Sequence, residues 1–212
     1  KQKGFESAKL DAELLISSVL NLKQVELYTR SNHILTEGEL KACGVNIKRR
    51  LKGEPIAYIL GQKEFYLNTF KVNSDVLIPR PETEHIVEQA LAWAKRNKLE
   101  KTPLRIVDLG TGSGCVGLSL LKELPSANLL AIDISSGAID VAEQNAIRLG
   151  LKDRVDFLTA DAAELEESHL PKKFNGKLDL VVANPPYISY DDLEVQKHVK
   201  QFEPSLALFS EG

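Results

Sequence analysis

The stretch Leu104-Arg-Ile-Val-Asp-Leu-Gly-Thr-Gly-Ser-Gly114 decides the fold of this chain. Its first part, Leu104 to Asp108, is largely apolar and predicts a buried strand. The glycines from Gly110 to Gly114 permit a tight turn and a close approach of the backbone to a ligand. Because the apolar stretch Val116 to Leu124 follows, we expect a strand, a glycine-rich loop and then a helix whose N-terminal N–H groups face the ligand.

Three more strands and one more helix continue this alternation. The apolar runs Asn128–Asp133, Val155–Thr159 and Leu178–Ala183 predict strands, and Ser136–Leu149 predicts a helix. Strands that alternate with helices need right-handed crossovers, which give a parallel sheet with helices on both faces. The predicted fold class is therefore α/β, with a doubly wound, mainly parallel sheet.

The carboxyl ends of these strands carry the candidate cofactor site, because ligands of such sheets bind there. The carboxylate of Asp133, at the end of the second strand, can accept hydrogen bonds from both hydroxyls of a ribose. Asp161, after the third strand, can accept one from an adenine amino group, and its alternative role is the N-cap of a helix. The predicted cofactor-binding residues are Asp108, Gly110, Thr111, Gly112, Ser113, Gly114, Asp133, Asp161, Ala162 and Asn184.

Asn184-Pro-Pro-Tyr187 follows the fourth strand and predicts a rigid shelf for a planar amino group. The prolines fix their own φ and keep Asn184 out of helical geometry, so that acceptors stand beside the flat ring of Tyr187. The alternative is an ordinary proline-rich turn after a strand. We predict catalytic roles for Asn184, Pro185 and Tyr187, and substrate contacts for these three residues and Pro186.

The glycine-rich loop alone leaves two cofactor classes open. Gly112, Gly114 and Gly117 also satisfy the GxGxxG spacing of dinucleotide-binding proteins, so an oxidoreductase is an alternative. The fourth strand favours a methyl donor instead. Hydride transfer needs a donor or an acid near a carbonyl, whereas the shelf at Asn184 offers acceptors, which suit a substrate with an NH2 group.

The part before the sheet predicts two further structures. Apolar residues recur at helical spacing from Ser7 to about Leu51, and the stretch from Phe65 to Val72 predicts a β-hairpin that turns at Asn68-Thr69. A helix is expected from Pro81 to Lys95, with proline in its first turn. We expect a helical substrate-docking domain over residues 1–62, a hairpin linker over 63–80 and the sheet domain over 81–212.

Charge and composition limit the function classes. The net charge is −3, with +4 over residues 1–63 and −7 over residues 64–212. The negative charge of the longer segment, residues 64–212, argues against a nucleic-acid-binding surface. The basic cluster Lys48-Arg49-Arg50 could touch RNA or an acidic protein, but a solvated helix face is the expected role. Cys43 and Cys115 are the only two cysteines, they lie far apart in the sequence, and no CxxC or Cys/His spacing accompanies them, which argues against a zinc site and a disulfide framework. The sequence has no apolar run of about 18 residues and no secretory signal, so we expect a cytoplasmic protein without membrane contact.

Three motifs together resemble the HemK/PrmC family of protein-glutamine N5-methyltransferases: Gly53-Glu-Pro-Ile-Ala-Tyr58, Leu77-Ile-Pro-Arg-Pro-Glu-Thr-Glu84 and Asn184-Pro-Pro-Tyr187. The resemblance covers nearly the whole chain and implies a class I, Rossmann-like methyltransferase domain. It implies S-adenosyl-L-methionine as the methyl donor and S-adenosyl-L-homocysteine as the product. The implied substrate is the glutamine of the Gly-Gly-Gln motif of class 1 peptide chain release factors, which act in translation termination.

The resemblance also places Leu77 and Arg80 at the substrate, although Arg80 could instead be a structural ion-pair partner. We also expect a monomer that needs neither a metal nor a nucleic acid. The alternatives are a methyltransferase of a ribosomal-protein glutamine or of a nucleic-acid amino group. Sheets of this family have seven strands and only four are predicted before Gly212, so we expect the C-terminal strands to lie outside this sequence.

Overall fold

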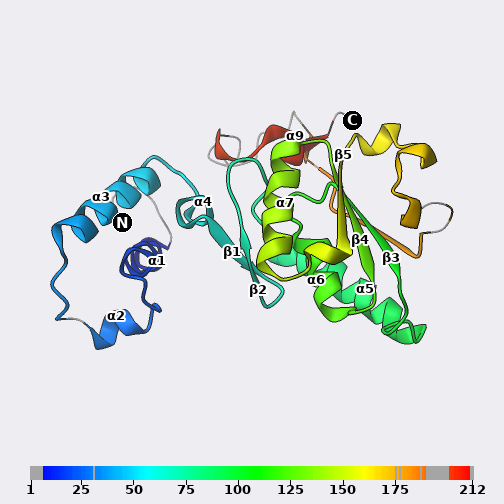
Figure 1. Cartoon of the computed structure of the whole chain (residues 1–212). Helices are drawn as coiled ribbons and strands as arrows, with labels where there is room; N and C mark the ends of the chain where they lie inside the picture. The colour runs from blue at the N-terminus through cyan, green and yellow to red at the C-terminus, as the bar shows by residue number, and fades with distance from the viewer. Residues whose placement is uncertain are drawn as a thin grey trace. The chain divides into compact units, whose positions relative to one another are not determined.

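The computed structural model of the chain falls into two units, Lys1–Gly61 and Gln62–Gly212. The structure describes residues 7–30, 32–174, 176, 178–186, 188–189 and 201–210. The first unit is helical, with α1 (Ala8–Leu20), α2 (Glu26–Thr29), α3 (Glu37–Leu51) and α4 (Ile56–Leu60), drawn in blue to cyan in Figure 1. The helical pattern predicted from the apolar spacing is therefore present.

A capping box begins α3. The backbone N–H of Glu39 donates to Thr36 Oγ1 at 3.2 Å, and the backbone N–H of Thr36 donates to Glu39 Oε2 at 2.7 Å. Two N–H groups that the helix itself cannot bond are satisfied in this way, which fixes where α3 starts.

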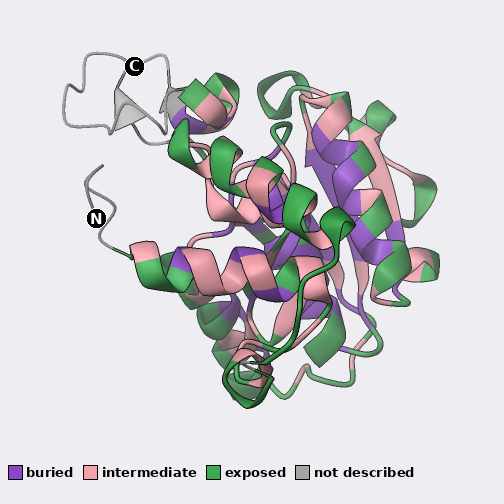
Figure 2. Cartoon of the chain, turned by 90° about the vertical axis from the view of Figure 1, so that its left-hand side faces the viewer, coloured by how far each residue is buried: buried purple, intermediate pink, exposed green. Residues whose placement is uncertain are grey.

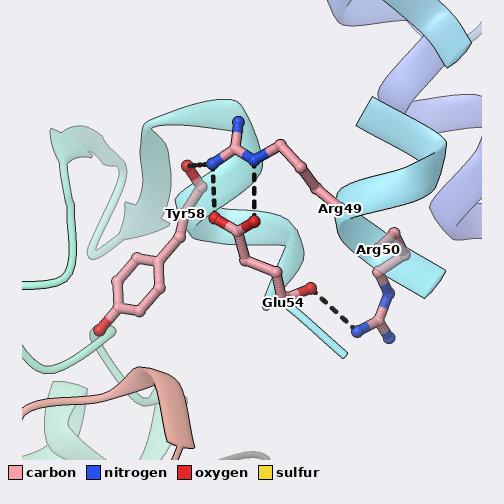
Figure 3. A network of polar contacts seen from close by, with 4 residues as sticks. All are labelled: Arg49, Arg50, Glu54 and Tyr58. Atoms are coloured by element: carbon pink, nitrogen blue, oxygen red, sulfur yellow. Dashed lines mark hydrogen bonds and ion pairs between the residues drawn. The ribbon is translucent and has the colours of Figure 1, made fainter. Parts of the chain in front are cut away.

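The basic cluster at the end of α3 is engaged in ion pairs. Arg50 Nε donates to Asp11 Oδ2 at 2.8 Å and so joins α3 to α1. Arg49 donates to both carboxylate oxygens of Glu54, at 2.8 and 2.5 Å, and to the carbonyl of Tyr58 at 3.5 Å (Figure 3). Two of the three basic side chains are therefore engaged within the first unit. Arg49 keeps the solvent exposure expected of a solvated helix face, at 40 %, whereas Arg50, at 21 %, is more buried than expected.

The hairpin consists of β1 (Gln62–Phe65) and β2 (Asn68–Lys71), paired antiparallel with Phe65 opposite Asn68. Its turn is therefore Tyr66-Leu67, with φ values of 43° and 61°, and the turn predicted at Asn68-Thr69 was wrong. The physical reason is the register that buries Phe65 and Phe70, whose rings meet edge to face with centroids 6.1 Å apart. Both rings belong to the main apolar core of the second unit.

A parallel four-stranded sheet lies at the centre of the second unit (Figure 1). Its order is β5-β4-β3-β6, with bounds Val155–Thr159, Asn128–Asp133, Arg105–Leu109 and Leu180–Ala183. The predicted α/β doubly wound class and all four strands are confirmed, each strand end within two residues. The connecting elements are η1 (Pro81–Thr83), α5 (Glu84–Arg96), α6 (Cys115–Glu123), α7 (Ser136–Arg148), η2 (Lys152–Arg154), η3 (Ala162–Glu164), η4 (Glu167–His169) and η5 (Lys172–Phe174).

The remaining described elements are short. β7 (Ile188–Ser189) pairs in parallel with β8 (Phe209–Ser210), and α9 (Ser205–Leu208) directly precedes β8. The helix predicted over Pro81–Lys95 begins as the 3₁₀ turn η1 and continues as α5.

Both faces of the sheet are covered. Ile106 and Val107 are neighbours on β3, yet they belong to different apolar clusters, because successive strand residues point to opposite faces. The cluster around Ile106 includes residues of α5, α6 and α7, and the cluster around Val107 includes Phe174 of η5. Buried residues are purple in Figure 2. This burial fixes the strand register and therefore the positions of the strand ends.

Candidate active site

A cavity of about 240 Å³ lies at the carboxyl ends of the four strands. The strand register explains why the ends meet there. Leu109 of β3 is paired with Ile132 of β4 and with Ala183 of β6, so the residues that follow, Asp133 and Asn184, flank the start of the glycine-rich loop. The predicted site residues that line the cavity are Leu77, Arg80, Asp108, Gly110, Thr111, Gly112, Ser113, Asp133, Asp161, Ala162, Asn184 and Pro186.

Asp108 organises the glycine-rich loop from beneath. Its side chain is 2 % exposed, and its Oδ2 accepts from the Thr111 hydroxyl at 2.8 Å and from the Gly117 N–H at 3.1 Å. Burial, which disfavours the charged form, raises the pKa of the Asp108 carboxyl to about 6. Asp108 therefore ties the loop to the first turns of α6, and its charge state is sensitive to mildly acidic pH.

Gly114 is the one loop glycine predicted to bind cofactor that does not line the cavity. Its φ is 78°, its N–H donates to the Thr111 carbonyl at 2.8 Å, and a Cβ at this position would lie 2.8 Å from Leu118 Cδ1. Glycine is required at position 114 because of this positive φ and because a side chain would clash with α6. Gly114 thereby shapes the loop that presents Thr111 and Gly112 to the cavity.

Asp133 links the loop to α7. Its Oδ2 accepts from the Gly112 N–H at 2.8 Å and its Oδ1 accepts from the Ser135 N–H at 3.0 Å. A carboxylate oxygen can accept two hydrogen bonds, so each oxygen of Asp133 retains acceptor capacity for a ligand hydroxyl. Ser135 in turn caps α7 by accepting from the Ala138 N–H at 3.2 Å.

Asp161 is an N-cap, which was the alternative considered from the sequence. Its Oδ1 accepts from the Ala163 N–H at 2.9 Å at the start of η3. The residue also lines the cavity together with Ala162, so the capping bond leaves Asp161 available at the cavity wall. A cap fixes the carboxylate in one place, which is useful for recognising a ligand group.

The shelf after β6 is only partly described. Asn184 is half-buried and lines the cavity with Pro186, whereas Pro185 is exposed and is not part of the lining. Tyr187, predicted to be catalytic, lies outside the described residues. The structure therefore brings Asn184 to the same cavity as Asp108 and Asp133.

Two parts of the lining were missed from the sequence. Asp75 lies against the first turn of α7, since a Cβ on Gly137 would be 3.1 Å from Asp75 Cβ. The sequence around Asp75 indicates only a turn. The structure shows this turn, in which the Asp75 N–H donates to Asn73 Oδ1 at 3.0 Å. Pro204, Leu206 and Ala207 also line the cavity and come from the far end of the chain.

The lining is acidic. Asp75, Asp108, Asp133 and Asp161 all contribute to it, and Arg80 is the one basic residue among its described members. The Arg80 charge is offset by Glu203, whose Oε1 accepts from Arg80 Nη2 at 2.7 Å. An acidic cavity favours a ligand with positive charge and disfavours a pyrophosphate.

Known proteins resemble both units. Residues 1–61 match the PrmC N-terminal domain and residues 100–208 match a methyltransferase domain. A release factor glutamine methyltransferase from Leptospira interrogans is 44 % identical over 100 % of this chain and 72 % of its own length. This chain belongs to the release factor glutamine methyltransferase family. A second member, from Chlorobaculum tepidum, is 39 % identical over 98 % of this chain and 70 % of its own length.

Membership of this family confirms the resemblance to HemK/PrmC proteins and shows that the chain is a methyltransferase with a Rossmann-like sheet. Among solved structures, the N-terminal domain of human METTL16 in complex with SAH is 23 % identical, with a TM-score of 0.45, over 59 % of this chain and 49 % of that one. TrmN from Thermus thermophilus is 29 % identical, with a TM-score of 0.37, over 48 % of this chain and 28 % of that one.

None of the helices among the described residues is both long enough and apolar enough to cross a membrane. No group of three or more His, Cys, Asp and Glu side chains among these residues could hold a metal ion.

Proposed function

We propose that this chain transfers a methyl group from S-adenosyl-L-methionine to the side-chain amide nitrogen, N5, of the glutamine in the Gly-Gly-Gln motif of class 1 release factors. The observation that carries the proposal is that one cavity combines an acidic, glycine-rich cofactor wall with Asn184 of the Asn-Pro-Pro-Tyr shelf. The names of the relatives from Leptospira interrogans and Chlorobaculum tepidum support a release factor as the substrate.

The cofactor wall suits S-adenosyl-L-methionine, which supplies an electrophilic methyl group when bound. Asp133 would accept from the ribose hydroxyls and Asp161 from the adenine amino group, because both carboxylates line the cavity. The N–H groups of the loop from Gly110 to Ser113 would face the cofactor. The acidic lining favours its sulfonium and ammonium charges and argues against the dinucleotide alternative, which carries a pyrophosphate.

The shelf suits the glutamine amide. Its nitrogen is a poor nucleophile because its lone pair is delocalised, so the enzyme has to orient it. In the proposal Asn184 Oδ1 and the Pro185 carbonyl accept the two amide hydrogens, and Tyr187 packs against the amide plane. Holding both hydrogens aligns nitrogen and methyl, and such positioning contributes up to roughly 7–11 kcal/mol in well-oriented reactions. The acceptors also stabilise the positive charge that develops on nitrogen.

The remaining assignments follow from this substrate. The helical domain of residues 1–62 would dock the release factor, and Leu77, Arg80 and Pro186 would contact the segment that carries the glutamine. Hydrogen-bond acceptors are enough to orient the glutamine amide, so the proposed transfer needs no metal ion. A substrate of the translation machinery places the reaction in the cytoplasm, and we expect the chain to act as a monomer.

A methyl-transfer assay tests the proposal. The chain is incubated with tritiated S-adenosyl-L-methionine and an intact release factor, and the label is located by mass spectrometry of the Gly-Gly-Gln peptide. Asn184→Ala should lower transfer by at least about a hundredfold, because positioning is lost, while calorimetry should show a much smaller loss of S-adenosyl-L-homocysteine binding, because the other predicted cofactor-binding residues are retained. Asn97→Ala, which removes an exposed amide that donates to the Trp93 carbonyl, is the matched control.

Each possible result of this assay tests a separate part of the proposed function. Unchanged turnover of Asn184→Ala would remove the catalytic role of the shelf. Label on a ribosomal-protein glutamine or on a nucleic-acid amino group, with none on the release factor, would establish one of the alternative substrates. Release factor binding without any transfer would reduce the chain to a binding module.

A further inference from the structure

Glu203 joins two distant segments of the cavity wall. Its side chain is 2 % exposed, its Oε1 accepts from Arg80 Nη2 at 2.7 Å, and its Oε2 accepts from the Ile78 N–H at 3.2 Å. The partners are 123 and 125 residues away in the sequence. Both carboxylate oxygens are therefore used to connect one segment to the other.

The two segments share the cavity. Residues 76, 77, 79 and 80 line it from one side of this link, and residues 204, 206 and 207 line it from the other. Neither segment is part of the central sheet: residues 77–80 have no regular secondary structure, and α9 has only four residues before the two-residue strand β8. Pro79 and Pro204 lack an N–H group, which further reduces the backbone bonds that could hold these walls.

The buried Glu203 carboxylate makes strong hydrogen bonds to Ile78 and Arg80. Charge-assisted bonds to an arginine and to a backbone N–H are about twice as strong as neutral ones. The Ile78 N–H is buried with its residue, which is 5 % exposed, so losing its acceptor would leave a donor unsatisfied. The link is therefore strong enough to fix the spacing of the two walls.

The link also orients Arg80. Its side chain lines the cavity and is 30 % exposed, and Glu203 is the one acceptor that the described residues supply to it. A guanidinium has five N–H donors in a rigid plane. A single bond to a buried carboxylate anchors one edge of the guanidinium and leaves donors for a ligand carbonyl.

We propose that Glu203 is a positioning residue for the methyl acceptor. This inference rests on the proposed function. Glu203 holds the wall of residues 76–80 against the wall of residues 204–207, and it orients Arg80 so that the guanidinium binds a backbone carbonyl of the protein substrate beside the reacting glutamine. Glu203 acts through Arg80 and through the wall, and it does not touch the reacting atoms.

Kinetics of Glu203→Gln and Arg80→Gln test this role. Glutamine at position 203 keeps an acceptor for the Ile78 N–H but loses the charge that holds Arg80. Each variant should raise the KM for the release factor and lower kcat, so that kcat/KM falls by about tenfold to a hundredfold, as expected for a small displacement. The Kd of S-adenosyl-L-homocysteine should change by less than about threefold. The double variant should fall no further, because the two side chains act as one unit.

Asp179→Asn is the matched control. Asp179 Oδ2 likewise accepts from a backbone N–H and from an arginine, both of Arg105, at 2.8 and 3.3 Å, and neither residue lines the cavity. The Asp179 side chain is 23 % exposed whereas that of Glu203 is 2 %, so this variant should lose less stability in urea, and it should keep kcat/KM within about twofold of the unmodified chain. A structural role alone for Glu203 predicts the same result as this control.

Three results would overturn the proposal. The first is Glu203→Gln with a loss of stability in urea but unchanged kcat/KM. The second is a loss that appears only as weaker S-adenosyl-L-homocysteine binding, which would assign the wall to the cofactor. If the unmodified chain transfers no methyl group to a release factor, the proposed function fails separately. In that case, hydrogen exchange is measured with S-adenosyl-L-homocysteine bound. Faster exchange at residues 76–80 and 204–208 in Glu203→Gln, but not in Asp179→Asn, supports the link. Unchanged exchange in Glu203→Gln is the third overturning result.

Discussion

The side-chain amide of Asn145 pairs with the backbone of Lys71 as a neighbouring strand would. Asn145 Oδ1 accepts from the Lys71 N–H at 2.7 Å, and its Nδ2 donates to the Lys71 carbonyl at 3.0 Å. The same Nδ2 donates to the Ser113 carbonyl at 2.9 Å, and Asn145 is 0 % exposed. One residue of α7 therefore holds both the hairpin and the glycine-rich loop of the cavity.

Asn145→Asp should destabilise the chain by about 1–3 kcal/mol at neutral pH, because a buried carboxylate would face two carbonyls that have lost their donor. Urea unfolding measures the change. The loss should shrink as the pH falls, since a protonated carboxyl can again donate one hydrogen bond. Asn97→Asp alters an exposed amide with one bond to the Trp93 carbonyl and should stay within about 0.5 kcal/mol. Equal losses in the two variants would contradict the bridging role.

Gly117 is a helical glycine without room for a methyl group. A Cβ there would lie 2.7 Å from Leu129 Cδ2 and 2.9 Å from Asp108 Oδ2. Gly117→Ala should cost about 1–3 kcal/mol through overpacking and should weaken S-adenosyl-L-homocysteine binding by displacing Asp108. Gly44 is the comparison, since it lies in α3 with nothing within 4 Å of a Cβ, and Gly44→Ala should stabilise by up to about 1 kcal/mol. A stabilising Gly117→Ala would mean that the contact with β4 is looser than the structure shows.

The stability of the chain should depend on pH through Asp108. Its pKa is raised from 3.8 to about 6 by burial, so the folded state binds this proton more tightly than the unfolded state does. The stabilisation is fully present below the unfolded pKa of 3.8 and is lost as the pH rises through about 6. Between pH 7.5 and pH 4.5, the unmodified chain should therefore gain roughly 2 kcal/mol of stability relative to Asp108→Asn, out of the roughly 3 kcal/mol that a shift of this size is worth well below pH 3.8. Urea unfolding of both proteins across this range measures the difference, and a constant difference would contradict the raised pKa.

The elements predicted from the sequence are those set by local patterns. The apolar run of β4 appears at the predicted residues because a strand buried on both faces needs a nearly continuous apolar stretch, and the run of the edge strand β5 was also placed correctly. The glycine-rich loop was also found, since its glycines adopt positive φ at Gly110, Gly112 and Gly114. Local sequence carries both signals.

The features that were missed depend on partners far along the chain. Arg80 does form an ion pair, but its partner Glu203 is 123 residues away and no spacing rule connects them. Asp75 reaches the cavity only because the chain after β2 passes the first turn of α7 near Gly137. The hairpin turn was misplaced for a related reason. Asn68 is a good turn residue, yet burial of Phe65 and Phe70 decides the register.

That register leaves Leu67 in a strained turn, and relieving the strain should stabilise the chain. Leu67 has φ 61° and its side chain is fully exposed, so the residue takes a left-handed conformation without any packing in return. The left-handed region costs a non-glycine residue about 1–2 kcal/mol, and two-residue hairpin turns of this kind favour glycine. Leu67→Gly should therefore stabilise the chain by up to about 1 kcal/mol, once the added freedom of glycine in the unfolded state is subtracted. Glu64→Gly, at an exposed position of the paired strand β1, is the control and should destabilise it by about 0.5–1 kcal/mol. Urea unfolding of the two variants measures both changes, and a destabilising Leu67→Gly would show that the turn at Tyr66-Leu67 is not strained.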